Sequence, residues 1–273
     1  MKHVLPIAVI AVVVILIVVG IFCLRNKSSV SAEPADAGRA SADSLKELFR
    51  GEADTFVTAG GMDIDFFSIK HASIAVRAGE KWIYLDPVTN GAQPQTDYTT
   101  LPKADYIIVT HDHYDHYDSL AIEQLSTEAT RLIANPSTIA AFGRGEALAN
   151  GGSLTTAEGW TIEAVPAYNN SEDKLQFHPQ GRDNGYVLTI DGFRIYVAGD
   201  VEVIPELSDI KDIDVAFLPC NLPFTMTPEQ CAEAAGIVSP KVLFPYHYGE
   251  TDLTRLTDLL EGSGIEVRVR LYQ

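Results

Sequence analysis

One short segment of the chain holds three histidines and two aspartates, and it directly follows the apolar run at 106–109. Imidazole and carboxylate groups are the ligands that proteins use for zinc and related divalent cations. His111 and His113 are two residues apart, so an extended chain presents both imidazoles on one side. Asp115 and His116 follow where the loop is expected to enter a helix, so one loop can offer ligands to two ions. A solvated, histidine-rich surface turn is the weaker alternative.

Two further candidate ligands also come directly after apolar runs. Asp200 follows the run at 195–199, and its carboxylate could bridge two cations, although an aspartate after glycine is also common in plain turns. His247 lies between two tyrosines after the run at 242–245. Taken alone it would be read as a packed histidine, but with the histidine-rich loop it becomes the natural remaining ligand.

At this point the sequence resembles the metallo-β-lactamase superfamily over about residues 62–273. The match is carried by His111-x-His113-x-Asp115-His116, and the later Gly199-Asp200 and Tyr246-His247-Tyr248-Gly249 elements follow in the family's order. The resemblance implies an α/β fold, a four-layer αββα sandwich with the site at one edge of two sheets. The elements 71–73 and 84–87 look more specifically like the lactonase-like branch related to ascorbate-6-phosphate lactonase.

One position departs from the family's pattern. Members often carry a histidine shortly after Val-Pro-Ala, whereas this chain has Asn169, and an amide oxygen is a weaker zinc ligand than imidazole. His178 is the nearest spare imidazole and could reach in from the following loop. It could equally be a surface histidine, and the long polar loop from 169 to 184 could instead shape a substrate pocket.

The resemblance implies two divalent metal ions, zinc first, with manganese or iron as alternatives. His111 and His113, with Asn169 or His178, would hold one ion. The second ion would be held by Asp115, His116 and His247, with Asp200 as the bridge. The expected catalytic residues are Asp115, which would orient a metal-bound hydroxide, and His71, a proton shuttle or a donor behind the ligands. His71 could equally satisfy a backbone carbonyl, and Asp86 either supports a ligand or caps its turn.

The elements that must position these residues follow a pattern that occurs twice. Strands are predicted at 64–69, 73–76, 82–85 and 104–109, then a helix at 119–125, a strand at 131–134 and a helix at 136–142. The second half predicts strands at 160–165, 186–190, 193–197, 215–218, 241–245 and 266–271. Its helices are predicted from 227 and at 252–260. Two sheets packed face to face with helices outside would accommodate this order.

The N-terminus predicts a membrane segment. Residues 4–24 are almost wholly apolar and long enough to cross a bilayer, so 1–27 is predicted as an uncleaved anchor, with a cleaved signal segment or a buried soluble helix as the alternatives. Residues 28–60 have linker composition, with a short helix at 44–49, and 61–273 is the predicted hydrolase domain. The short N-terminal tail favours a domain outside the cytoplasm.

Charge and cysteine content narrow the partners. The formal net charge of −17 repels phosphate backbones, so nucleic acid is not an expected partner. Cys220 and Cys231 could pair in an oxidising compartment or remain small buried thiols.

The predicted function is hydrolysis of a small-molecule ester, lactone or phosphodiester by metal-bound hydroxide. β-Lactamase activity itself is not expected, because superfamily membership does not fix the chemistry. Two alternatives remain: a membrane-tethered metal-binding protein without catalysis, which Asn169 favours, and a di-iron oxidoreductase of the same fold. The sequence predicts neither the particular substrate nor the oligomeric state.

Overall fold

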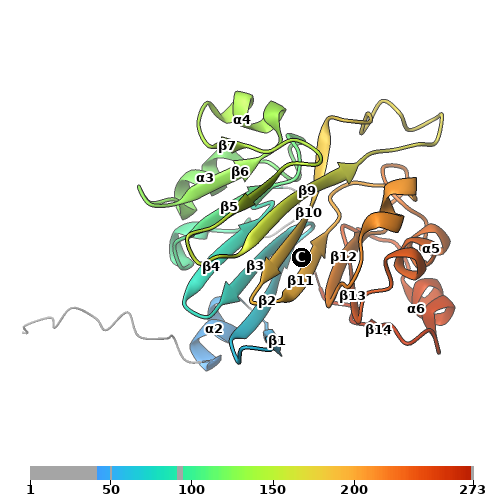
Figure 1. The fold of residues 1–273 in the computed structure, drawn as a ribbon, viewed down its shortest axis with the longest axis horizontal. Helices are drawn as coiled ribbons and strands as arrows, with labels where there is room; N and C mark the ends of the chain where they lie inside the picture. Colours follow the sequence, from blue (N-terminus) through green and yellow to red (C-terminus); the bar gives the residue numbers. More distant parts are fainter. Residues whose placement is uncertain (1–41, 50, 91–94, 272–273) are drawn as a thin grey trace, which may run out of the picture. The chain divides into compact units, whose positions relative to one another are not determined.

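The computed structural model describes residues 42–49, 51–90 and 95–271. These residues form two seven-stranded sheets (Figure 1). In spatial order, the first sheet contains β1 (Asp54–Val57), β2 (Asp63–Lys70), β3 (Ser73–Ala78), β4 (Lys81–Leu85), β5 (Tyr106–Val109), β6 (Arg131–Ala134) and β7 (Glu146–Ala147). The second contains β14 (Glu266–Val267), β13 (Val242–Tyr246), β12 (Val215–Pro219), β11 (Phe193–Val197), β10 (Asp183–Ile190), β9 (Thr161–Ala167) and β8 (Ser153–Thr155).

The two halves of the chain repeat one topology, as the sequence predicts. In the first sheet β1 to β4 pair antiparallel and β4 to β7 pair parallel. In the second sheet β8 to β11 pair antiparallel and β11 to β14 pair parallel. Both sheets are therefore mixed, and each ends its half of the chain on parallel strands.

Three hydrophobic cores separate four layers. One core lies between the sheets, where residues such as Phe66 and Val76 of the first sheet meet Leu188 and Phe217 of the second. The outer face of the first sheet packs on α2 (Ala42–Leu48), η1 (Tyr98–Thr100), α3 (Ser119–Leu125) and α4 (Pro136–Phe142). The outer face of the second packs on η2 (Pro205–Asp209), α5 (Pro228–Val238) and α6 (Thr254–Leu260). Figure 1 shows α3 and α4 on one side of the sheets and α5 and α6 on the other, consistent with the predicted αββα sandwich.

Local sequence signals explain two well-formed elements. Helix α5 begins with the predicted capping box: the Thr227 hydroxyl accepts from the Gln230 amide, and the Gln230 side chain accepts from the Thr227 amide. Asp191 and Gly192 have φ angles of 48° and 78°, the left-handed pair that a tight turn between β10 and β11 requires. These signals are local and therefore readable from the sequence.

The folded unit begins earlier than the predicted boundary at residue 61. The short helix predicted at 44–49 within the linker corresponds to α2, whereas β1 is an additional strand in the region predicted as linker. Leu45 and Phe49 are buried against the first sheet, and β1 pairs along β2. Asp54 of β1 also binds the guanidinium groups of Arg268 and Arg270, beyond β14. The strand predicted at 266–271 is shorter than expected, at 266–267.

Some expectations fall outside the described residues. The predicted membrane segment at 4–24 and the linker up to residue 41 lie there. Within the described residues, no helix is both long and apolar enough to cross a membrane. Cys220 and Cys231 are buried and free, which corresponds to the thiol alternative rather than to a disulfide.

Candidate metal centre

The predicted site residues all lie in loops at the strand ends. In the first half, His71 occupies the β2–β3 turn, and the histidine-rich loop at 111–116 follows β5. In the second half, His178 lies between β9 and β10, Asp200 follows β11 and His247 follows β13. The structure brings all of them together: His71, His111, His113, Asp115, His116, His178, Asp200 and His247 form three overlapping groups of ligand atoms.

The first group is made of His111, His113 and His178. His113 Nδ1 lies 3.1 Å from His111 Nε2 and 3.1 Å from His178 Nε2. Burial lowers the pKa of His111 well below its usual value and also lowers that of His113. Both imidazoles are therefore neutral near pH 7, which is the form that binds a metal.

Asn169 lies behind His178 rather than in the group itself. Its side-chain oxygen is 2.8 Å from His178 Nδ1, and its amide nitrogen donates to the Phe224 carbonyl at 2.9 Å. The amide thus holds the His178 ring from the far side and turns Nε2 towards His111 and His113. Of the two predicted alternatives, the structure places the histidine among the ligand atoms.

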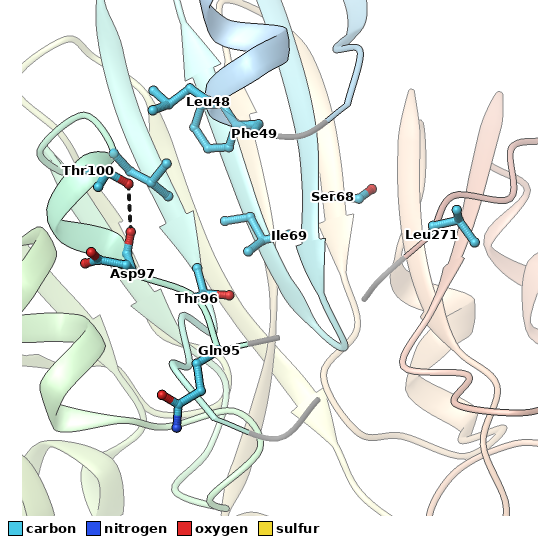
Figure 2. Close-up of a pocket in the computed structure, with 10 residues that line it drawn as sticks. Leu48, Phe49, Ser68, Ile69, Gln95, Thr96, Asp97, Thr100 and Leu271 are labelled. Atoms are coloured by element: carbon cyan, nitrogen blue, oxygen red, sulfur yellow. Dashed lines mark hydrogen bonds between the residues drawn. The ribbon is translucent and has the colours of Figure 1, made fainter. Parts of the chain in front are cut away.

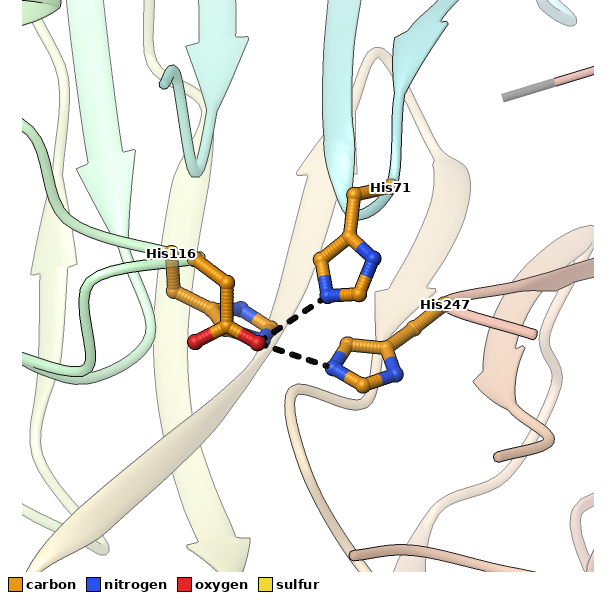
Figure 3. A group of neighbouring side chains, drawn as sticks. His71, His116 and His247 are labelled. Atoms are coloured by element: carbon orange, nitrogen blue, oxygen red, sulfur yellow. Dashed lines mark hydrogen bonds and ion pairs between the residues drawn. The ribbon is translucent and has the colours of Figure 1, made fainter. Parts of the chain in front are cut away.

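The second group is made of His71, Asp115, His116 and His247. The rings of His71, His116 and His247 converge from three separate elements (Figure 3). Asp115 Oδ2 lies 3.1 Å from His71 Nε2 and 3.6 Å from His247 Nε2. Burial alone would raise the pKa of Asp115, but its interactions with His247 and His71 hold it below the usual range. His71 therefore sits among the expected ligands and not behind them.

Asp200 lies between the two groups. Its Oδ1 is 3.2 Å from His116 Nε2, and its Oδ2 is 3.2 Å from His178 Nε2 and 3.4 Å from His247 Nε2. Burial opposes ionisation, but His247 and His116 outweigh it and hold the pKa of Asp200 well below its usual value. One ionised carboxylate therefore faces both groups, as expected for a bridge.

Asp86 orients the group from beneath. Its carboxylate accepts from the backbone amide and the hydroxyl of Thr110, each at 2.7 Å, and lies 2.8 Å from His116 Nδ1. A carboxylate at Nδ1 fixes the ring and leaves Nε2 free to face a metal. Burial would lower the pKa of His116, but Asp200 and Asp86 raise it well above its usual value.

Several ring and carboxylate atoms of the site have no hydrogen-bond partner. Among the described residues, these buried atoms include His116 Nε2, Asp200 Oδ1 and both ring nitrogens of His247. Although Asp200 lies 3.2 Å from His116 Nε2 and 3.4 Å from His247 Nε2, none of these four atoms makes a well-formed hydrogen bond, and buried polar atoms without one are costly. Divalent cations bound between them would satisfy the imidazole lone pairs and the carboxylates together, so the residues fit a metal centre.

The backbone is strained at three of these positions. His71, Asp86 and His247 have φ angles of 47°, 43° and 47°, a left-handed conformation that is unfavourable for residues with a side chain. The His247 amide donates to the His71 carbonyl at 3.0 Å, which ties a loop of each sheet to the other. Strain held in place by the surrounding fold is typical of functional sites.

A buried ion pair that the sequence analysis did not single out holds the loop of His178. Lys174 Nζ donates to Glu202 Oε1 and to the Thr225 carbonyl, both at 2.7 Å. Glu202 also accepts from the backbone amides of Asn170 and Ser171 at 2.9 and 2.8 Å. A lysine in a polar loop has no sequence signal that separates a buried partner from a solvated one.

A separate hollow lies on the outer face of the first sheet. Figure 2 shows this cavity of about 380 Å³, lined by residues that include Leu48, Phe49, Ile69 and Leu271. None of its lining residues belongs to the histidine groups. It is therefore distinct from the candidate metal centre.

Comparison with known proteins now places this geometry in a family. The family model described as the β-lactamase superfamily domain matches residues 81–248, a span that includes the histidine-rich loop, Asp200 and His247. The chain belongs to the metallo-β-lactamase superfamily. The superfamily assignment predicted from the motifs is confirmed, whereas the lactonase-like branch is not.

Relatives within the superfamily carry the name UPF0173 metal-dependent hydrolase. One from Thermococcus kodakarensis is 32% identical over 186 residues, which cover 65% of this chain and 81% of the relative. One from Enterococcus faecalis is 31% identical over 190 residues, 65% of this chain and 83% of the relative. The prediction of a metal-dependent hydrolase is confirmed at this level.

Solved structures show the same fold. A chain from Parabacteroides distasonis, described as a metal-dependent hydrolase, is 47% identical with a TM-score of 0.78, covering 81% of this chain and 99% of its own. A metallo hydrolase from Ignicoccus hospitalis is 25% identical with a TM-score of 0.66, covering 76% of this chain and 95% of its own. A di-iron β-hydroxylase from Streptomyces venezuelae, 15% identical with a TM-score of 0.61, covers 77% of this chain and 52% of its own, and shows a shared fold alone.

Proposed function

We propose that the protein hydrolyses a small ester, lactone or phosphodiester with two divalent metal ions, zinc being the first candidate. The observation that carries the proposal is the position of Asp200, which faces His116, His178 and His247 at 3.2–3.4 Å. One carboxylate shared by two histidine groups is the arrangement expected of a two-metal hydrolase. The names of the relatives support the same reaction class.

The residues divide between two metal positions. His111, His113 and His178 would hold one ion, and His116, His247 and Asp115 would hold the other, with Asp200 between them and His71 beside the second group. Bound divalent ions acidify water and polarise the carbonyl or phosphoryl oxygen of a substrate. Imidazole ligands suit zinc, manganese and iron alike, so the donor set does not by itself choose among them.

Asp115 and His71 would handle the proton. The pKa of Asp115 lies below its usual range because His247 and His71 outweigh the effect of burial, so its carboxylate is ionised at neutral pH and able to orient water. Burial lowers the pKa of His71, so its ring is neutral near pH 7. Its side chain keeps 20% exposure, and its Nε2 lies 3.1 Å from Asp115 Oδ2. His71 therefore lies between the Asp115 carboxylate and solvent, where a proton shuttle would be placed.

Among the three substrate classes, we propose a lactone as the first candidate. The elements 71–73 and 84–87 favour a lactone, as in the lactonase-like branch.

We also propose that residues 4–24 tether the domain to a membrane on its outer side. Membrane fractionation and protease access in whole cells would test that placement, and a wholly cytosolic protein would contradict it.

Metal analysis combined with a substrate panel tests the reaction. The full chain, dialysed against zinc, manganese or iron(II), is assayed with lactones, carboxylic esters and phosphodiesters. We expect about two ions per chain and turnover of one of the three classes. Asp115→Ala should abolish turnover while the far-ultraviolet circular dichroism stays unchanged, and exposed Asp209→Asn serves as the control. Two bound ions without turnover of any class would favour the non-catalytic metal-binding alternative.

A further inference from the structure

Two loops next to the first histidine group expose apolar side chains. Leu175 is 49% exposed in the loop that carries His178, while Leu222 and Phe224 are 52% and 40% exposed in the loop after β12. Large apolar side chains gathered at one place on a surface usually mark a binding site. We call Leu175, Phe177, Leu222 and Phe224 the apolar wall.

The apolar wall is linked to the metal centre through Asn169. Phe177 directly precedes His178, and its ring contacts that of Phe224 edge to face, with centroids 5.1 Å apart. The Phe224 carbonyl accepts from Asn169, and Asn169 in turn holds the His178 ring. One buried amide therefore connects the wall to a predicted metal ligand.

The wall is also fixed in place. Lys174, beside Leu175, is 7% exposed and donates to Glu202 and to the Thr225 carbonyl, so it joins the two loops of the wall. Glu202 is fully buried and accepts from the backbone of the same loop. Apolar groups held outward by a buried ion pair are preorganised to receive a ligand.

The charges near the wall disfavour an anionic occupant. The two nearby cations already have counter-ions: Lys174 forms an ion pair with Glu202, and Arg182 forms one with Asp183. Glu172 and Asp173 are exposed in the same loop as Leu175. An uncharged apolar group is therefore the occupant that fits, and the adjacency to His178 places it beside the reacting centre.

We propose that the apolar wall binds an uncharged alkyl or aryl substituent of the substrate, next to the bond that is cleaved. This inference rests on the proposed function and narrows its substrate class. Polar sugar-like or phosphorylated leaving groups would not use such a surface.

A chain-length series tests the proposal on the metal-loaded full chain. The substrates are p-nitrophenyl esters, p-nitrophenyl alkyl phosphodiesters and γ-alkyl lactones with alkyl groups of one to six carbons. We expect kcat/KM to rise by about two- to fourfold per methylene in the reactive series. Phe224→Ser and Leu175→Ser should flatten that rise, while Leu259→Ser, a similarly exposed leucine on α6, should leave it unchanged.

A binding measurement separates this inference from the proposed function. Saturation-transfer NMR with 1-hexanol, an uncharged probe, reports contact of the terminal methyl group without any reaction. We expect a signal in the wild type and in Leu259→Ser that is at least halved in Phe224→Ser and Leu175→Ser. If the signal is reduced in the two serine variants but no series is turned over, the binding role of the apolar wall is supported and the proposed hydrolase activity is contradicted. Thermal unfolding establishes that each variant is folded, and Leu175→Ser stands in should Phe224→Ser fail.

Equal chain-length slopes and equal NMR signals in all variants would overturn the proposal. Cosedimentation with neutral phosphatidylcholine vesicles covers the alternative occupant. Vesicle binding that is lost in Phe224→Ser and Leu175→Ser, with unchanged slopes, would overturn it in favour of a membrane-contact surface.

Discussion

Asp200 is the residue that faces both histidine groups, and its ionised state depends on them. Its two oxygens lie 3.2 Å from His116 Nε2 and 3.2 Å from His178 Nε2. Replacing it by asparagine keeps the shape but leaves one oxygen where two were needed, and turns amide hydrogens towards an imidazole.

Asp200→Asn should lower the affinity for both ions. We expect a loss larger than the roughly 10–100-fold that follows removal of a partner behind a ligand. Equilibrium dialysis against zinc, followed by metal analysis, measures it, with exposed Asp209→Asn as the control. Retention of both ions at wild-type affinity would contradict the bridging role.

Substitutions of His178 and Asn169 should affect metal binding differently. His178→Ala removes a ligand atom and should reduce the bound metal from two ions to one. Asn169→Ala removes the hydrogen bond at His178 Nδ1 and should weaken the first position by about 10–100-fold while the second is unchanged. Zinc titration with a competing chelator distinguishes the two outcomes. A reversed order of effects would show that the amide is the ligand.

The sequence singles out the candidate metal-centre residues because their types carry the chemistry. Histidines and aspartates after apolar strands stand out at 111–116, Asp200 and His247. The role of His71 is harder to predict, since a histidine before a strand can serve in a turn as well as in a ligand group. Lys174 and Glu202 could not be found, because burial of a charged pair depends on which loops meet in space.

At the scale of elements, the loop from 169 to 178 depends on one buried acid. Glu202→Gln leaves Lys174 buried without its counter-ion and weakens the acceptor of two backbone amides. We expect a loss of about 3–5 kcal/mol in the free energy of unfolding, measured by urea denaturation.

Glu202→Gln should also lower the metal affinity of the group formed by His111, His113 and His178, because His178 lies on this loop. Glu229→Gln is the matched control, since Glu229 and its partner Arg255 form a solvent-exposed pair that contributes little to stability. A loss equal to that of the control would mean that the ion pair does not hold the loop.

The turn after β11 requires glycine. Gly199 has a φ of 64°, and an added Cβ would lie 2.8 Å from the Asn184 carbonyl oxygen. Gly199→Ala should cost about 1–3 kcal/mol and lower metal affinity, because Asp200 is the next residue. Gly236→Ala in α5 has open space and should stabilise by about 0.5–1 kcal/mol. Differential scanning calorimetry compares the two, and equal melting temperatures would refute the turn argument.

Elements with local signals were predicted closely, and those that depend on distant partners were not. Helices α3 and α4 match their predicted bounds, since apolar periodicity and caps are contiguous in the chain. Strand β1 has no strong local signal, because it is only four residues long and its Asp54 is held by arginines more than two hundred positions away.

At the scale of the whole molecule, the metal centre joins the two sheets. His71, His111, His113 and His116 come from loops of the first sheet, and His178, Asp200 and His247 from loops of the second. Ions held between them are ligands of the folded state alone, so they must stabilise it.

Removal of the ions should therefore lower the melting temperature. One site at a metal concentration 100-fold above its dissociation constant contributes about 2.7 kcal/mol. For a domain of this size that corresponds to a shift of roughly 5–11 °C, at about 2–4 °C per kcal/mol. Calorimetry before and after dialysis against a chelator measures the shift, and zinc should restore it. An unchanged melting temperature would argue against ions that span the sheets.

The repeated topology has a consequence for how the molecule can be divided. A cut between β7 and β8 would yield one fragment with all four histidines of the first sheet's loops and another with His178, Asp200 and His247. The first fragment would also hold Asp115, so the candidate ligands would be divided between the two fragments, and each would expose one apolar sheet face. We expect zinc to promote association of the two fragments, so that they reassemble when the metal is present and stay apart when it is removed.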